Sequence, residues 1–240
     1  MGGGRIPGPL GIGSNREGLD KGTLASARVP GPIGMIPRSQ NFDFSIDQNT
    51  RILAATAYGE GSGNNVFEEM AALANVLVRQ QKARAYSSAG DFIRGDKTFA
   101  FAAHDGNPRY AKLMLASESQ ISADRGMAAA VRGARNALSA NPTDYSNGAF
   151  FWDGADIMSN YGKHKKVLGG IHFGVPSHNI YKIESKDVEG EAWWKDAHGR
   201  DTKLRGKWHY KFESTAAYGG TIFWKYSDNF LRATGNTEFK

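Results

Sequence analysis

The clearest hydrophobic pattern in the chain lies between residues 66 and 80, where apolar positions recur every three or four residues. This spacing places them on one face of an α-helix. The apolar face contains Val66, Met70, Leu73 and Leu77, and the polar face contains Glu68, Asn75 and Arg79. Glu69 belongs to neither group and lies on the flank of the apolar face. A carboxylate at that position is partly desolvated unless it lines a cleft.

A further helix is predicted just before this one, over residues 47–58. Asp47 or Asn49 can cap its N-terminus, and alanine-rich sequence with good helix propensity follows. The glycines on either side of Glu60 end the helix and begin a glycine-rich turn. Glu60 is therefore expected at the C-terminal end of one helix, and Glu69 in the first turn of the next.

Later segments divide into two kinds. Residues 108–117 and 127–140 are typical of helices, the first with proline at its start and the second stopped by an Asn-Pro pair. From Phe150 onward the chain changes to short runs that favour β-structure, which are 170–175, 179–183 and 220–226. The predicted fold class is α+β, with a mainly helical domain and a β-leaning C-terminal extension.

The predicted domain organisation has an arm and one domain. Residues 1–45 are rich in glycine, proline and serine, and 29–37 cannot form a regular helix or a central strand. We interpret 1–45 as a linker or extended arm. Residues 46–240 form the domain, divided into a catalytic core over 46–160 and a basic, aromatic-rich extension over 161–240.

Composition narrows the possible functions. Of the 240 residues, 40% are hydrophobic, which is enough for a core. The chain has no cysteine, so disulfides, thiolate nucleophiles and cysteine-based zinc sites are excluded. It has no apolar run long enough to span a membrane, and its first residues lack the apolar core of a signal peptide.

The net charge of +6 comes mostly from residues 161–240, which contain 14 Lys and Arg against 9 Asp and Glu, a net of +5. A basic surface suits an anionic polymer such as nucleic acid, acidic polysaccharide or peptidoglycan. The alternative is ordinary charge that keeps the protein in solution.

Glu60 and Glu69 are the main candidates for chemistry. The free carbonyl groups at a helix C-terminus, together with burial, raise the pKa of a nearby carboxyl, so Glu60 can keep a proton for donation. The N-terminal helix dipole favours ionised Glu69, which can act as a base or stabilise positive charge on a sugar ring. Two carboxyls with separated pKa values are what cleavage of a glycosidic bond requires. The alternatives are a solvated loop glutamate and an ordinary helix acid.

Two further segments contain candidate cleft residues. His104 and Asp105 precede a Gly-Asn-Pro turn that either lines a cleft or is incidental. Residues 141–154 combine amide, carboxylate and aromatic side chains, which suit sugar hydroxyls and sugar faces. The full set of candidate substrate-binding residues is Tyr58, His104, Asp105, Asn147, Phe151 and Trp152.

Other catalytic motifs are missing from the sequence. The six histidines show no His-Glu-x-x-His spacing, so a zinc amidase has no sequence signature here. There is no phosphate-binding loop and no Gly-x-Ser-x-Gly nucleophile elbow. We therefore expect a metal-free reaction without a cofactor.

Three segments, taken in order, resemble the SleB-type cell-wall hydrolases, the spore cortex-lytic enzymes and their relatives. Ala54-Ala-Thr-Ala-Tyr-Gly-Glu-Gly61 is similar to the family's Tyr-Gly-Glu opening. Met70-Ala-Ala-Leu-Ala-Asn-Val-Leu-Val-Arg79 resembles its Ala-Val-Ala-Asn-Val-Val-Leu-Asn-Arg helix. Asn141-Pro-Thr-Asp-Tyr-Ser-Asn-Gly-Ala-Phe-Phe-Trp152 resembles its Asp-Pro-Thr ending. The resemblance covers about residues 47–155.

The resemblance implies a lysozyme-like, mainly helical domain that cleaves peptidoglycan glycan strands, with Glu60 as the catalytic acid. The chain departs from the family after Glu60, where the turn differs, and at Val78, where the family has asparagine. Glu69 stands where the family commonly has Gly or Gln, which suggests a two-carboxylate variant. Residues 161–240 match nothing in the family.

The expected function is a muramidase that hydrolyses the β-1,4 bond between N-acetylmuramic acid and N-acetylglucosamine. Lytic transglycosylation of the same bond, a non-catalytic wall-binding module and a histidine-dependent amidase remain open. The glycine- and proline-rich arm without a signal peptide resembles the joint before toxin domains of type VI secretion effectors. That resemblance implies an antibacterial toxin delivered to a rival's periplasm, with an immunity protein and a secretion carrier as partners. Peptidoglycan, and not nucleic acid, is the expected ligand.

Overall fold

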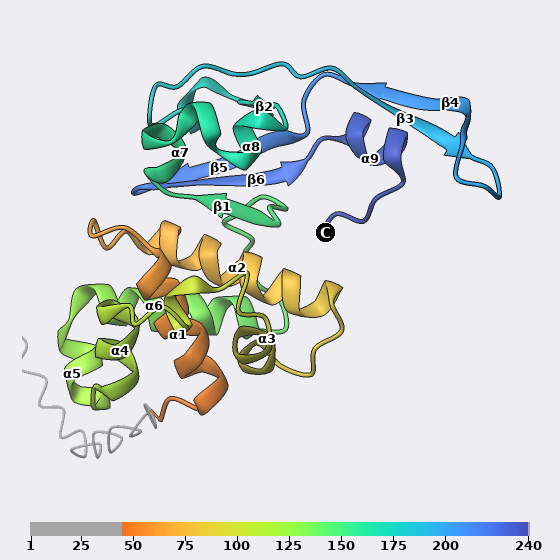
Figure 1. Cartoon of the computed structure of the whole chain (residues 1–240). Coiled ribbons are helices and arrows are strands. Elements are labelled where there is room, and N and C mark those ends of the chain that lie inside the picture. The colour runs from red at the N-terminus through yellow and green to blue at the C-terminus, as the bar shows by residue number, and fades with distance from the viewer. Residues whose placement is uncertain (1–44, 240) are drawn as a thin grey trace, which may run out of the picture. The chain divides into compact units, whose positions relative to one another are not determined.

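The computed structural model describes residues 45–239, which belong to one compact unit beginning at Asp43. The predicted arm over 1–45 lies outside the described residues, apart from Ser45. The described residues have the α+β class that the sequence predicts (Figure 1). Helices fill the first part of this region, and most strands follow residue 170.

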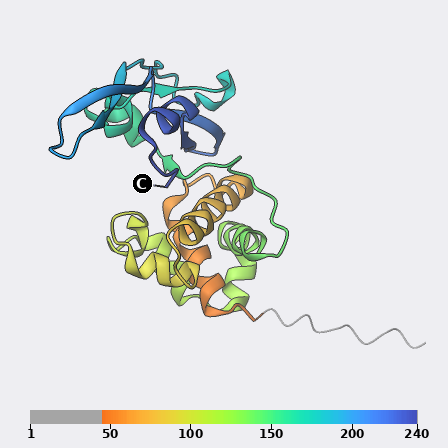
Figure 2. The same ribbon diagram turned by 90° about the vertical axis from the view of Figure 1, so that its right-hand side faces the viewer.

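Three helices form the first core: α1 (Gln48–Glu60), α2 (Phe67–Ala83) and α6 (Arg125–Leu138). Asp47 caps α1, because its carboxylate accepts a hydrogen bond from the Thr50 amide at 2.9 Å. The helix α2 is buried on almost every side, and α6 packs beside it (Figure 2). Gly133 of α6 permits this contact, since a Cβ there would lie 2.9 Å from the Ala71 backbone.

Short helices surround this core, and the three short α-helices among them each begin with a side-chain cap. The short helices are α3 (Ala89–Gly95), η1 (Phe101–Ala103), α4 (Pro108–Leu115) and α5 (Glu118–Ala123). The N-caps of α3, α4, α5 and α6 are Ser88, Asn107, Ser117 and Asp124. The helices expected over 108–117 and 127–140 are therefore present, with ends within about two residues of the prediction.

The C-terminal part contains a mixed four-stranded sheet in the order β1-β6-β5-β2. Its strands are β1 (Phe151–Asp153), β2 (Ile171–His172), β5 (Phe212–Tyr218) and β6 (Thr221–Tyr226). The pair β2–β5 is parallel, and the pairs β1–β6 and β5–β6 are antiparallel. Short helices connect β1 to β2 and follow β2, namely α7 (Asp156–Ser159), η2 (Tyr161–Lys163), α8 (Lys165–Leu168) and η3 (Pro176–His178).

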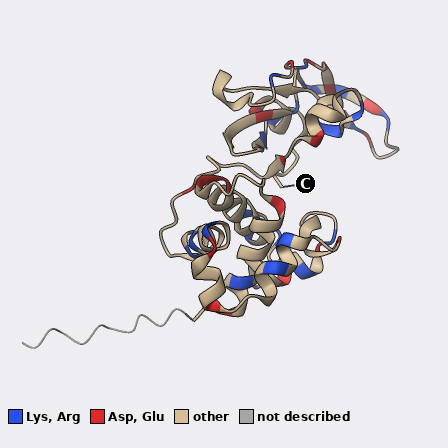
Figure 3. Cartoon of the chain, turned by 90° about the vertical axis from the view of Figure 1, so that its left-hand side faces the viewer, with Lys and Arg blue, Asp and Glu red and all other residues tan. Residues whose placement is uncertain are grey.

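A two-stranded ribbon, β3 (Gly190–Lys195) with β4 (Asp201–Trp208), packs against α9 (Asp228–Thr234). Both signs of charge lie along this ribbon (Figure 3). Lys195 pairs with Asp201 at 2.7 Å, and Lys207 pairs with Glu191 at 2.5 Å. Two of the lysines after residue 160 are therefore paired with acids within the ribbon.

Two sequence predictions need correction. Residues 179–183 form turns and not a strand, because the Asn179 side chain hydrogen-bonds both the amide and the carbonyl of Ile183. The boundary at residue 160 does not separate a core from an extension. The strand β1, before that boundary, pairs with β6, after it, through Phe151–Trp224, Trp152–Phe223 and Asp153–Ile222.

No helix within residues 45–239 is both long enough and apolar enough to cross a membrane.

Candidate active site

Glu60 ends α1 and is half-buried. Its Oε1 accepts a hydrogen bond from the Ala102 amide at 2.7 Å, and the Trp152 side chain also hydrogen-bonds its carboxyl. Burial raises the pKa of Glu60, and the negative charge of Asp105 adds to the rise, while the two hydrogen bonds oppose it. The direction of the shift agrees with the sequence prediction, with burial as its main cause.

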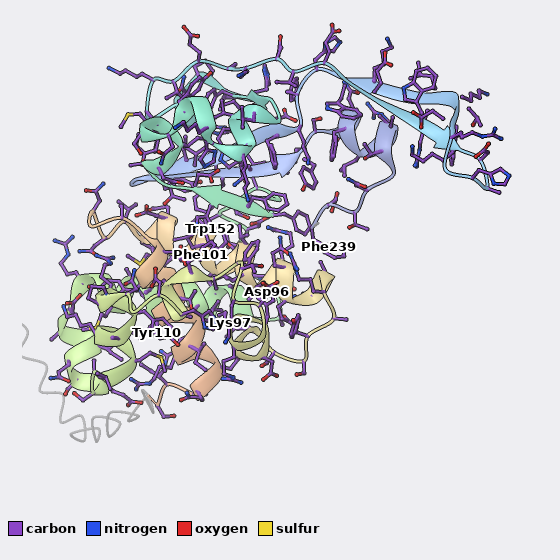
Figure 4. All side chains as sticks on the ribbon, in the orientation of Figure 1. Asp96, Lys97, Phe101, Tyr110, Trp152 and Phe239 are labelled. Atoms are coloured by element: carbon purple, nitrogen blue, oxygen red, sulfur yellow. The ribbon has the colours of Figure 1, made fainter. Side chains whose placement is uncertain are left out.

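The Glu60 carboxyl lines a cavity of about 500 Å³. Residues from the helical part form one wall, and residues in and after β1 form the other. The lining residues are Glu60, Thr98, Phe99, Phe101, Phe151, Trp152, Asp153, Gly154, Asp156 and Lys166. Figure 4 shows Phe101 and Trp152 close to each other beside this cavity. The arrangement places one acid beside several aromatic rings.

The aromatic residues give the cavity an apolar surface. Trp152 packs edge-on against Phe99 with ring centroids 5.0 Å apart, and Phe101 is 58% exposed. Phe151 contacts Tyr226 at 4.9 Å and so belongs partly to the C-terminal core. Exposed or half-buried rings of this kind can stack on the apolar faces of sugars, so the cavity suits a glycan.

Glu69 lies in the first turn of α2, as the sequence predicts, but it does not face a cleft. Its side chain is fully buried in the structure, and it does not line the cavity. The carboxylate accepts hydrogen bonds from the Ser62 amide at 3.1 Å and hydroxyl at 2.7 Å, from the Gly220 amide at 3.0 Å and from the Thr221 hydroxyl at 2.7 Å. These donors fill the carboxylate, so Glu69 joins the α1–α2 turn to the β5–β6 turn and does not face Glu60 across a cleft.

The other predicted cleft residues fall into two groups. Phe151 and Trp152 line the cavity, and Asp105 is exposed and close enough for its charge to raise the pKa of Glu60. Tyr58 does not reach the cavity: it is 4% exposed, and the Arg109 guanidinium covers its ring at 3.9 Å. His104, whose ring nitrogen bonds the Ile93 carbonyl, does not line the cavity either.

Asn147 does not line the cavity and instead stabilises a turn. It adopts a positive φ of 48° in the loop before β1, and its amide donates to the Thr215 carbonyl at 3.1 Å. Asparagine tolerates this left-handed conformation better than most residues, which explains its place in the turn.

Sequence reasoning missed a charged cluster that also lines the cavity. Asp153 Oδ1 lies 2.8 Å from Lys166 Nζ and 3.3 Å from His164 Nε2, and His164 Nε2 lies 3.3 Å from Asp156 Oδ2. The hydrogen bond that the His164 ring donates to the Asp153 carboxylate raises the pKa of His164, and the charges of Asp153 and Asp156 act in the same direction. The only sequence signal was the position of Asp153 directly after the aromatic run.

The same cluster continues into a neighbouring hollow of about 480 Å³. The two cavities share Phe101, Asp153, Asp156 and Lys166, so they adjoin each other, and we call the two together the groove. The second hollow adds Asn160, Lys163, His164 and Lys165. The second hollow therefore has more lysines and fewer aromatic side chains in its lining than the first.

Asp153, Asp156 and His164 are also the described residues whose donor atoms lie close enough together, within 4.8 Å, to hold a metal ion. The Lys166 ammonium group already contacts Asp153 at 2.8 Å and places a positive charge there. That charge opposes the binding of a second cation. The donor set therefore fits an ion-pair network better than a metal centre.

Comparison with known proteins adds no family assignment, since no family model, curated protein or solved structure matches this chain.

Proposed function

We propose that the protein is a peptidoglycan glycosidase that cleaves the β-1,4 bond between N-acetylmuramic acid and N-acetylglucosamine. Glu60 is the general acid: its proton goes to the bridging oxygen as the bond from C1 to that oxygen breaks. The observation that carries the proposal is a half-buried carboxyl with a raised pKa in the wall of an aromatic groove. The resemblance of residues 47–155 to SleB-type hydrolases supplies the substrate class.

The Ala102 amide and the Trp152 side chain support this role. Both donate to the Glu60 carboxyl and fix its orientation toward the cavity wall. They also stabilise the carboxylate that remains after proton transfer. Phe101 and Trp152 line the cavity together with Glu60, and their rings can stack on the sugars of the glycan.

Glu60→Gln tests the proposal on purified sacculi. The variant should release soluble muropeptides about 10²–10⁴-fold more slowly, because it cannot donate the proton. Glu68→Gln, on the exposed face of α2, is the matched control and should keep full activity. Mass spectrometry of the products separates the classes, since a glycosidase releases disaccharides and an amidase releases stem peptides. Wild-type protein that binds sacculi but releases nothing would identify a wall-binding module instead.

Lytic transglycosylation is the second candidate, and one observation favours it. The structure places Glu69 in a buried network, which removes the second glutamate from the site. A single acid is sufficient when the substrate's own 6-hydroxyl attacks C1. The product is then a 1,6-anhydro sugar, lighter than the hydrolysis product by one water, which the same mass spectra detect.

We further propose that the enzyme acts as an antibacterial toxin in the periplasm of a target cell. A type VI secretion carrier and an immunity protein are the partners that this setting implies. Expression in the periplasm of a sensitive bacterium should cause lysis, and Glu60→Gln should abolish it. Wild-type expression without any effect on the cell wall would contradict the toxin role while leaving the enzymatic assay unaffected.

A further inference from the structure

The groove contains three carboxyl groups within the described residues: Glu60, Asp153 and Asp156. Glu60 is the proposed acid. Asp153 is buried at 8% exposure and is held by Lys166 and His164, so water has little access to it. Asp156 differs from both, because its side chain is 60% exposed on the wall of the groove. It is the carboxylate that a water molecule in the groove can reach.

The short segment after β1 places Asp156 relative to the acid. Trp152 hydrogen-bonds Glu60, Asp153 follows it at the end of β1, and Asp156 begins α7 two residues beyond Gly154. The antiparallel pairing of β1 with β6 holds this segment in register. Glu60 and Asp156 therefore line the same cavity, and Asp156 lies only four positions after Trp152, the hydrogen-bond partner of Glu60.

A network of ion pairs orients the Asp156 side chain. Lys166 contacts Asp153, Asp153 contacts His164, and His164 Nε2 stands 3.3 Å from Asp156 Oδ2. Protonated His164 attracts the Asp156 carboxylate and restricts its orientation. Lys166 balances part of the negative charge, so this ion-pair network combines two carboxylates with two basic side chains.

We infer that Asp156, and not Glu69, is the second carboxylate of the site and the base that activates water for hydrolysis. The inference rests on the proposed glycosidase function. Glu60 gives its proton to the bridging oxygen as the C1–O bond breaks. Water adds to C1 from the opposite face and gives its proton to Asp156. Solvent then returns a proton to Glu60 and removes one from Asp156, so one water is consumed per bond. The new reducing end is the α-anomer.

Asp156→Ala with azide rescue is the decisive experiment. Without azide, the variant should lose about 10²–10⁴-fold in rate, because the attacking water has no base. Azide needs no deprotonation, so it should restore bond cleavage and give an α-glycosyl azide. Asp187→Asn, an exposed acid outside both hollows, is the matched control and should behave like wild type. Unchanged melting temperatures for both variants exclude misfolding.

Other outcomes would overturn the role of Asp156, and they can be told apart from a failure of the proposed glycosidase function. Full activity of Asp156→Ala with an inactive Glu60→Gln keeps the glycosidase and removes Asp156 as base. Anhydro products or a β-anomer from wild type have the same consequence. Loss of activity in chelator, restored by a divalent ion, assigns Asp156 to a metal site instead. A wild-type protein that releases no saccharide would contradict the proposed glycosidase function itself.

His164 is a positioning residue, and its contribution is visible in the pH profile. The charged groups that face it are Asp153, Asp156 and Lys166. Its pKa is raised above the ordinary value of 6.5, so the imidazolium is lost only as pH rises through that higher value. Hydrolysis should fall in a distinct step over that range, and His164→Gln should lack the step. A profile identical to wild type would contradict this role.

Discussion

At the scale of the residue, the site depends on a carboxyl placed where its charge is costly. Glu60 is withdrawn from water, and Asp105 adds an unfavourable charge nearby. The Ala102 amide and Trp152 offset only part of this cost. Such opposition between stability and function is typical of catalytic groups, because the raised pKa that serves proton donation also penalises the ionised form.

This opposition predicts how Glu60→Gln changes stability. The folded-state pKa of Glu60 lies above its ordinary value of 4.5. The contribution of Glu60 to the free energy of unfolding is therefore fully present below pH 4.5 and is lost as pH rises through the raised pKa. The variant has no titrating group at position 60, so it does not lose this stability as pH rises. Its melting temperature relative to wild type should therefore rise with pH across that window and then level off.

Asp105→Asn provides the control for that measurement. Removing this charge should reduce the pH-dependent loss without abolishing it, because burial is the larger cause of the shift. A melting-temperature difference between Glu60→Gln and wild type that does not vary with pH would contradict the account.

At the scale of the element, Glu69 joins two turns that are far apart in sequence. It binds Ser62 next to α1, and Gly220 and Thr221 at the β5–β6 turn. Gly219 has a φ of 59°, and a Cβ there would collide with the Glu69 carboxylate. Both the backbone conformation and the close approach therefore require glycine at this position.

Glu69→Gln should lower the free energy of unfolding by about 3 kcal/mol, because its amide group would face donors that need an acceptor. Urea denaturation measures the change, and the exposed neighbour variant Glu68→Gln should lie within about 0.5 kcal/mol of wild type. The rate per folded molecule should stay close to wild type. A stable but inactive Glu69→Gln protein would restore Glu69 as a catalytic residue.

At the scale of the whole molecule, residues 161–240 complete the fold of the described residues. They supply β6, the partner of β1, and β1 carries Trp152 and Asp153 into the groove. Phe223 of β6 belongs to the helical core, and Arg84, at the C-cap of α2, donates to the carbonyl of Phe239. The C-terminal part is therefore needed for the site as well as for the core.

A chain that ends at residue 160 should fail to fold. It leaves β1 without β6 and buries Glu69 without two of its donors. Protease digestion and near-UV circular dichroism should show no stable tertiary structure. The control is a chain over 43–240, which keeps every contact described above and should fold. A protease-resistant, active 1–160 protein would show instead that the C-terminal part is a separate module.

The local sequence determined the main helices and the direction of the pKa shift of Glu60. Periodicity and the Asp47 cap place α1 and α2 close to their predicted ends, and the position of Glu60 at the end of a helix already indicates a raised pKa. These features depend on neighbours within a few residues, so they are visible in the pattern.

Tertiary structure alone decided which other carboxylate lines the candidate groove. Glu69 is buried because it meets donors from Gly220 and Thr221, 151 and 152 residues away along the chain. Asp156 reaches the groove because β1 pairs with β6 and because His164 folds back onto it. A one-dimensional pattern records the type of each side chain, whereas access to water and to hydrogen-bond donors is set by segments that meet only when the chain folds.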